Sequence, residues 1–216
     1  MERMERRVIG SSIEFREIVP DEDKDGKPLP VLQGYAARFN TRSLPLGMMG
    51  FREEIDPQAF DESLAKNPDV RFTFNHNPNK VYGRTKAGTL RCWRDDNGLR
   101  FEVALPRHHD AEGLAESIKR GDVTQCSFSF RTLDDDWSRD DEGNIVRRLL
   151  KVDIDNGDVA AVTFPAYPHT DVSVRSLDDA IGEQGAKRLI GRLGTESEIA
   201  AAAAAREREI ELAQLE

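Results

Sequence analysis

A six-residue run in the second half of the chain alternates serines with aromatic residues, and this alternation limits how the segment can fold. The run is Gln125-Cys126-Ser127-Phe128-Ser129-Phe130. Successive side chains of a β-strand point to opposite faces, so Phe128 and Phe130 can enter a core while Ser127 and Ser129 face the other way. The pattern therefore predicts a strand that holds two hydroxyl groups on a stiff support.

Short strand-like runs bounded by turn formers recur along most of the chain, with two brief helical patterns between them. The runs cover residues 7–19, 31–39, 70–74, 81–82, 89–93, 99–105, 123–133, 145–154 and 159–164. Two of them flank Asp95-Asp96-Asn97-Gly98, a strong hairpin signal. Helices are expected after Asp56-Pro57 and from Asp110 to Gly121. The pattern predicts a mainly β (α+β) fold, either a sandwich or a closed or partly closed barrel, because closure removes exposed strand edges.

A serine hydroxyl is a useful nucleophile when a base lies within hydrogen-bond reach. The chain has four histidines, and one of them is flanked by turn formers at a strand end, in Phe74-Asn75-His76-Asn77-Pro78. Histidine is the side chain whose protonation ordinarily changes near neutral pH. His76 and Ser127 are therefore the candidate base and nucleophile. Cys126 is an alternative nucleophile, but alternation directs it to the core side, where thiols are mostly inert.

Other residues that could carry chemistry form weaker patterns. His108-His109-Asp110 suggests a metal site, but no further ligand has a recognisable spacing, so we expect a polar loop and a helix N-cap there. The acidic residues 134–143 lack the spacing of a calcium loop and are expected to form a solvated loop. His169 is a competing base beyond the last strand. The sequence predicts no metal and no cofactor.

The charge balance limits the possible partners. The net charge of −9 argues against nucleic acid, because phosphate binding needs a clustered excess of cations. No apolar run approaches the about 20 residues that span a membrane, and the amino terminus lacks the apolar core of a signal peptide. We expect a soluble protein of a reducing cytoplasm with no nucleic-acid or membrane partner. Cys92 and Cys126 should be thiols there rather than a disulfide.

A third segment completes an ordered set of motifs. It reads Asn156-Gly157-Asp158-Val159-Ala160-Ala161-Val162-Thr163-Phe164-Pro165-Ala166-Tyr167-Pro168. It follows, in order, His76, Gly83-Arg84, Asp96-Asn97-Gly98-Leu99, Arg120-Gly121 and Ser127-Phe128-Ser129-Phe130. With this series the chain resembles the prohead maturation proteases of tailed bacteriophages, serine peptidases that share their fold with the herpesvirus capsid protease assemblin. The resemblance spans about residues 10 to 175. That family usually has glycine in place of Ser129 and more often glutamate in place of Asp158.

The resemblance implies an assemblin-like closed or partly closed antiparallel β-barrel with peripheral helices, and the activity of a serine endopeptidase. It assigns His76 as the base, Ser127 as the nucleophile and Asp158 as the residue that orients the histidine. Ser129 is a second hydroxyl beside the nucleophile, so which serine attacks stays open. An oxyanion hole is also required, and Arg84, Arg147 and Arg148 are candidates to steady its backbone amides.

The implied substrates are the scaffolding segment of the major capsid protein and the protease itself, which could form a homo-oligomer. Cleavage would take place in the host cytoplasm, inside the assembling prohead. The alternative is a noncatalytic protease-like scaffold or capsid assembly protein, which would keep the shape of a protease without its activity.

The composition changes late in the chain. Residues 1–176 form the expected protease domain, and residues 177–216 form a charged, alanine-rich tail that is helical or disordered. Alanine has the highest intrinsic helix propensity, so a helix is locally favoured around residues 200–205. This tail is either loosely ordered or a docking or self-cleaved segment.

Overall fold

The computed structural model describes residues 4–7, 12–22, 28–46 and 50–163. The expected domain boundary near residue 176, the alanine-rich tail and His169 lie outside these residues. Helices are few: α1 Asp61–Ala65, α2 His109–Arg120 and the short 3₁₀ helix η1 Thr85–Ala87. The strands are β1 Glu5–Arg7, β2 Ser12–Glu22, β3 Pro28–Arg38, β4 Arg52–Ile55, β5 Arg71–Phe74, β6 Val81–Arg84, β7 Leu90–Arg94, β8 Gly98–Ala104, β9 Gln125–Arg139, β10 Ile145–Asp153 and β11 Asp158–Val162.

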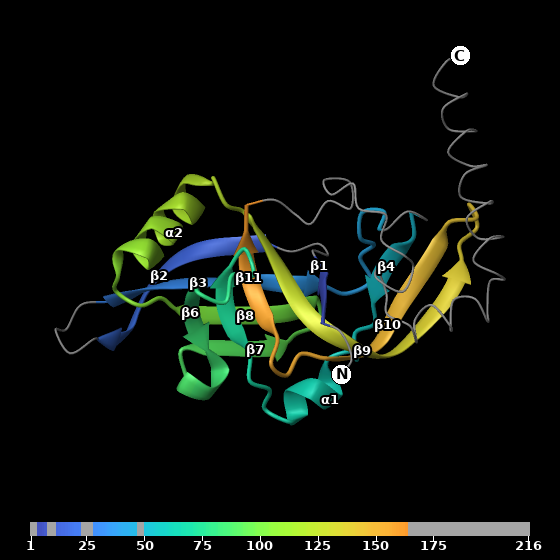
Figure 1. The fold of residues 1–216 in the computed structure, drawn as a ribbon, viewed down its shortest axis with the longest axis horizontal. Helices are drawn as coiled ribbons and strands as arrows, with labels where there is room; N and C mark the ends of the chain where they lie inside the picture. Colours follow the sequence, from blue (N-terminus) through green and yellow to red (C-terminus); the bar gives the residue numbers. More distant parts are fainter. Residues whose placement is uncertain (1–3, 8–11, 23–27, 47–49, 164–216) are drawn as a thin grey trace, which may run out of the picture.

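The strands form two sheets. One has the order β4-β10-β9-β11-β5-β6, with β1 paired to β9, and the other has the order β2-β3-β8-β7. Figure 1 shows β9 as the long strand that crosses the molecule and continues beside β10, which lies between β9 and β4. Helix α2 contacts β2 of the second sheet, and α1 lies on the opposite side of the molecule in this view. A mainly β fold with few helices is what the sequence predicts.

The strand pairing differs from the expected antiparallel barrel in two respects. Strands β4 and β10 pair in parallel, as do β5 and β11, so the larger sheet is mixed. Within the described residues neither sheet closes on itself. Parallel partners are far apart along the chain and need crossover connections. Alternation within each strand therefore cannot reveal such pairs.

The aromatic residues of β9 enter the core, as the alternation predicts. Phe128 stacks on Phe130 with 4.9 Å between ring centroids, and Phe60 contacts Phe128 edge-on at 5.7 Å. Cys126 is fully buried in the same cluster. Ser127 and Ser129 face the other way but are also buried, with 1% and 4% of their surface exposed. That face of β9 is therefore covered as well.

Two local expectations were wrong. Helix α1 begins at Asp61 rather than directly after Asp56, because the carboxylate of Asp56 accepts the backbone N–H of Gln58 and holds a turn there. Residues 134–139 of the expected acidic loop belong to β9, which pairs with β10, and residues 140–144 form the turn. Strand pairing and a buried ion pair between Asp135 and Arg147 explain this difference.

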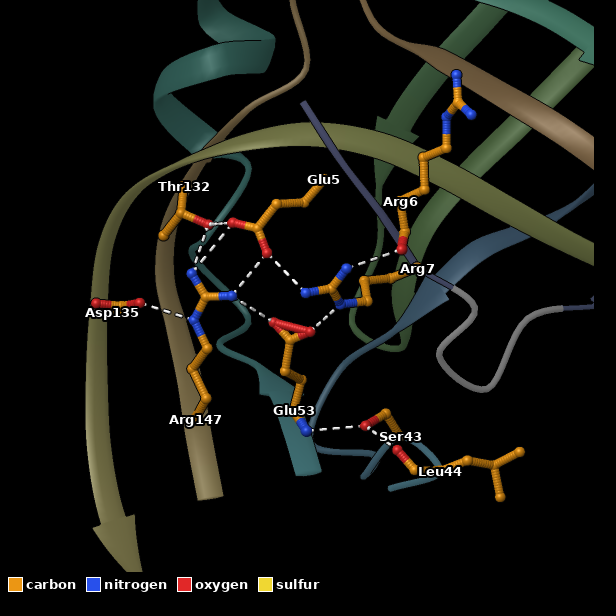
Figure 2. Close-up of polar contacts among 9 residues, drawn as sticks. All are labelled: Glu5, Arg6, Arg7, Ser43, Leu44, Glu53, Thr132, Asp135 and Arg147. Carbon is orange, nitrogen blue, oxygen red and sulfur yellow. Dashed lines mark hydrogen bonds and ion pairs between the residues drawn. The ribbon is translucent and has the colours of Figure 1, made fainter. Parts of the chain in front are cut away.

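A buried ionic cluster joins β1, β4, β9 and β10. The guanidinium of Arg147, which is 0% exposed, donates to Asp135, Glu5, Glu53 and Thr132 over 2.7 to 3.2 Å. Arg7 donates to Glu5 and Glu53 from the other side (Figure 2). The cluster therefore fixes the N-terminal strand β1 against the part of β9 that follows Ser127.

Candidate active site

Three neighbouring strands bring His76, Ser127 and Asp158 together. Strand β11 lies between β5 and β9 in the sheet. Asp158 is the first residue of β11, and Ser127 on β9 pairs with Ala160, two residues further along β11. His76 follows the end of β5. Segments more than 80 residues apart in the chain, at His76 and Asp158, therefore meet on one part of the sheet.

The turn that carries His76 has an unusual backbone. Asn75 and His76 have φ angles of 52° and 55°, in the left-handed region that asparagine and histidine adopt more readily than most residues. The backbone N–H of Asn75 donates to Ala161 over 2.9 Å. The side-chain oxygen of Asn75 accepts the N–H and the hydroxyl of Thr163 at 3.0 and 3.1 Å. The turn is thus tied to the end of β11, the strand that carries Asp158.

The three side chains form a continuous hydrogen-bonded series. Nδ1 of His76 lies 3.0 and 2.9 Å from the two carboxylate oxygens of Asp158, and Nε2 lies 2.7 Å from Oγ of Ser127. Because a carboxylate only accepts hydrogen bonds, Nδ1 carries the hydrogen and Nε2 accepts the hydroxyl of Ser127. The side chains of His76 and Asp158 are 10% and 13% exposed. This is the arrangement with which serine hydrolases activate a hydroxyl.

The environment keeps Asp158 ionised. Burial by itself raises the pKa of this carboxyl, but the hydrogen bond and charge of His76 and the hydroxyls of Ser129 and Thr73 outweigh it, so the net pKa lies below the ordinary value of 3.8. At neutral pH the group is therefore an anion facing the imidazole.

The two serines of β9 have different partners. Oγ of Ser127 contacts His76, whereas Ser129 accepts the backbone N–H of Asp158 over 2.7 Å and donates to its carboxylate oxygen Oδ1. The geometry therefore distinguishes the two hydroxyls that the sequence left open. Cys126 points into the core, where burial raises the pKa of its thiol.

Thr73 is a further residue at the site that the sequence patterns do not single out. Its hydroxyl donates to Oδ2 of Asp158 over 2.6 Å, and the residue is 3% exposed. The available signal was a polar residue between Phe72 and Phe74 in a strand that leads to His76, and this signal is weak by itself.

The other candidate residues lie in different surroundings. His108 caps α2 by accepting the backbone N–H of Ala111 on Nδ1 over 3.2 Å, as expected of an N-cap. The part of the chain that the structure describes contains no group of three or more His, Cys, Asp or Glu residues that could hold a metal ion. It also contains no helix long and apolar enough to cross a membrane. The three arginines considered for the oxyanion hole each pair with carboxylates: Arg84 with Asp69, Arg147 within the buried cluster, and Arg148 with Glu54 and Asp56.

Known proteins resemble this chain in fold and in sequence. A search of solved structures finds the capsid assembly protease gp21 of bacteriophage T4, with a TM-score of 0.50 and 12% sequence identity, over 74% of this chain and 97% of that chain. At this identity the likeness is one of fold alone. Residues 17–182 match the caudovirus prohead serine proteases, and the chain belongs to this family.

Proposed function

We propose that this protein is a serine endopeptidase in which Ser127 is the nucleophile, His76 the general base and Asp158 the residue that orients His76. The observation that carries the proposal is the 2.7 Å separation between Nε2 of His76 and Oγ of Ser127, with the carboxylate of Asp158 on the other ring nitrogen. A base in this position makes a hydroxyl nucleophilic, and the three residues have the roles of a serine protease triad.

The reaction proceeds in two halves. Oγ of Ser127 attacks the peptide carbonyl carbon while Nε2 of His76 takes the hydroxyl proton. The tetrahedral intermediate collapses, the C–N bond breaks, and His76 returns the proton to the leaving amine. The acyl group is then bound to Ser127 as an ester. Water attacks this ester while His76 takes a proton from the water. His76 then returns the proton to Oγ of Ser127 as the ester bond breaks and the acid product is released.

Asp158 acts through the imidazole. It accepts the hydrogen of Nδ1, which leaves the lone pair of Nε2 facing Ser127, and its charge stabilises the imidazolium that forms during attack. The carboxylate also neutralises the buried positive charge without itself taking the proton.

The substrates belong to the proposal as well. Membership of the prohead protease family supports cleavage of the scaffolding segment of the major capsid protein, and of the protease chain itself, inside the prohead as it assembles in the host cytoplasm. The bacteriophage T4 protein of similar fold is a capsid assembly protease. An assemblin-like, partly closed barrel is the finer fold proposal, supported by two sheets that share one apolar core.

A fluorophosphonate probe, which reacts with activated serines, tests the proposal. The wild-type chain should be labelled, His76→Ala should be labelled far more slowly, and Ser127→Ala should not be labelled while keeping its thermal unfolding transition. Ser129→Ala should still be labelled. Labelling that persists in Ser127→Ala would refute the assignment, and a wild-type chain that is not labelled at any pH would favour the noncatalytic scaffold.

A further inference from the structure

Two hydroxyl groups, one from each neighbouring strand, hold the carboxylate of Asp158. Ser129 on β9 donates to Oδ1, and Thr73 on β5 donates to Oδ2 over 2.6 Å. Ser129 also accepts the backbone N–H of Asp158 over 2.7 Å. Asp158 thus has one hydroxyl donor on each carboxylate oxygen in addition to Nδ1 of His76. The three donors to the carboxylate are Ser129 on β9, Thr73 on β5 and His76 in the turn after β5.

These contacts restrict the rotation of the carboxylate. An aspartate side chain has a broad rotational preference at its terminal bond, so a carboxylate with a single partner is free to turn. Here both oxygens are fixed from opposite sides of β11. Nδ1 of His76 consequently lies almost equally far from the two oxygens, at 3.0 and 2.9 Å. The orientation of the imidazole towards Ser127 therefore depends on the two hydroxyls.

Both donors are buried side chains. Ser129 is 4% exposed and Thr73 is 3% exposed, so water does not readily replace either hydroxyl. Hydrogen bonds to a charged acceptor in such surroundings are stronger than those between neutral groups. The loss of one donor would leave a carboxylate oxygen without its partner in a site that is mostly closed to solvent.

We propose that Ser129 and Thr73 are positioning residues that fix the carboxylate of Asp158, and through it the ring of His76, in the geometry required for attack by Ser127. The inference rests on the proposed function, since it concerns the same site. It gives Ser129 a role other than that of a second nucleophile, and it adds a residue from β5 to the site.

The first test compares rates of labelling by the fluorophosphonate probe. Ser129→Ala and Thr73→Val each remove one hydroxyl with little change in shape, and each should slow labelling about tenfold. Effects of this size follow the loss of residues that hydrogen-bond to the ligands of a metal site and orient them. Thr73→Ser keeps the hydroxyl and should recover most of the rate. With a peptide substrate the loss should fall on kcat rather than on KM, because neither residue is placed to contact the substrate.

Ser63 offers a matched control. It is also a buried serine, 3% exposed, and its hydroxyl accepts the N–H of Ile154 over 3.0 Å and donates to Asp153 over 3.1 Å. Ser63→Ala removes the same kind of contact away from the site. It should lower the melting temperature as much as Ser129→Ala but leave the labelling rate at the wild-type value.

A double-mutant cycle separates positioning from a general structural role. If Ser129 and Thr73 act through Asp158, their substitution should have no further effect on the labelling rate of Asp158→Ala. Losses that simply multiply in the combined variants would contradict the proposal. A second readout needs no activity: in the Ser127→Ala background, the ¹³C signal of the Asp158 carboxyl should titrate at a higher pH after Ser129→Ala or Thr73→Val, because each removes a donor that stabilises the anion.

The outcomes distinguish a failure of the positioning role from a failure of the proposed function. If wild type is labelled and Ser127→Ala is not, the proposed function stands regardless of the other variants. If Ser129→Ala and Thr73→Val are then labelled as fast as wild type, or if the Asp158 titration does not move, the positioning role alone is wrong. If labelling persists in Ser127→Ala, the proposed function fails first.

Discussion

At the scale of single residues, the site depends on side chains and backbone angles that few amino acids provide. Asn75 and His76 both have left-handed backbone angles, and the side-chain oxygen of Asn75 ties their turn to Thr163. Left-handed backbone costs an ordinary residue roughly 1–2 kcal/mol, and asparagine less. The conformation of this turn determines where the imidazole lies. The strained backbone of the turn therefore orients the candidate base.

We predict that Asn75→Ala slows probe labelling and lowers stability, because it loses two accepted hydrogen bonds and places alanine at a φ of 52°. Asn67→Ala is the control, since Asn67 has a φ of 51° but lies exposed after α1. Both variants should lose about 1 kcal/mol from the backbone alone. Only Asn75→Ala should lose labelling rate. Equal labelling in both variants would show that the turn does not control the position of His76.

Several of these residues could be predicted from the sequence. The order of His76, Ser127 and Asp158 and the alternation along residues 125–130 are visible in the chain, and the fold brings the three proposed site residues within hydrogen-bond distance. The roles of Thr73 and Ser129 were not visible, because they depend on β5 and β9 lying on either side of β11. Strand β11 pairs in parallel with β5 and antiparallel with β9, and both pairings join segments distant in the chain, which local patterns do not record.

At the scale of elements, the position of β9 depends on a strand that precedes the region matched to the family. Strand β1, residues 5–7, pairs with residues 128–130, and the family match begins at residue 17. The buried cluster around Arg147 holds β1 there, with Glu5, Glu53 and Asp135 facing Arg7 and Arg147. The breaking of a buried ion pair costs far more than the pair contributes, because the remaining charge stays buried.

Arg147→Met should therefore destabilise the fold by about 3–5 kcal/mol, since it removes the guanidinium that pairs with three buried carboxylates. Arg42→Met removes the exposed ion pair with Asp140 and should cost at most about 1 kcal/mol. Denaturant unfolding of both variants measures the difference. Similar losses in the two would mean that the cluster adds no more than a surface pair.

Glu5→Gln tests the pH dependence of the same cluster. Burial raises the pKa of Glu5, but the charges and hydrogen bonds of Arg7, Arg147 and Thr132 bring the net pKa below its ordinary value of 4.5. A lowered folded pKa gives stability that is present above the unfolded pKa and is lost as the pH falls through the folded pKa. Wild type should exceed Glu5→Gln in stability at neutral pH, and the gap should close below pH 4.5. A gap that stays constant into acid would exclude a contribution from the Glu5 carboxylate.

At the scale of the whole molecule, the described residues contain an apolar core and the proposed site. The buried residues of that core lie between Ile13 and Ala161, and both sheets contribute to it. The candidate nucleophile, base and acid all lie before residue 163. The alanine-rich part of the chain, residues 200–205, follows well after this core and after the family match, which ends at residue 182. Folding and catalysis should therefore be separable from whatever the last residues do.

A chain truncated after Gly182 should fold, keep a melting temperature within a few degrees of wild type and react with the probe at the wild-type rate. The same chain should be incorporated poorly into assembling proheads, if residues 183–216 dock on a partner as amphipathic helices commonly do. Copy number in purified proheads, compared between full-length and truncated Ser127→Ala chains, measures recruitment without self-cleavage. Loss of folding would show that the tail belongs to the protease domain, and normal incorporation would show that recruitment resides in the two-sheet core.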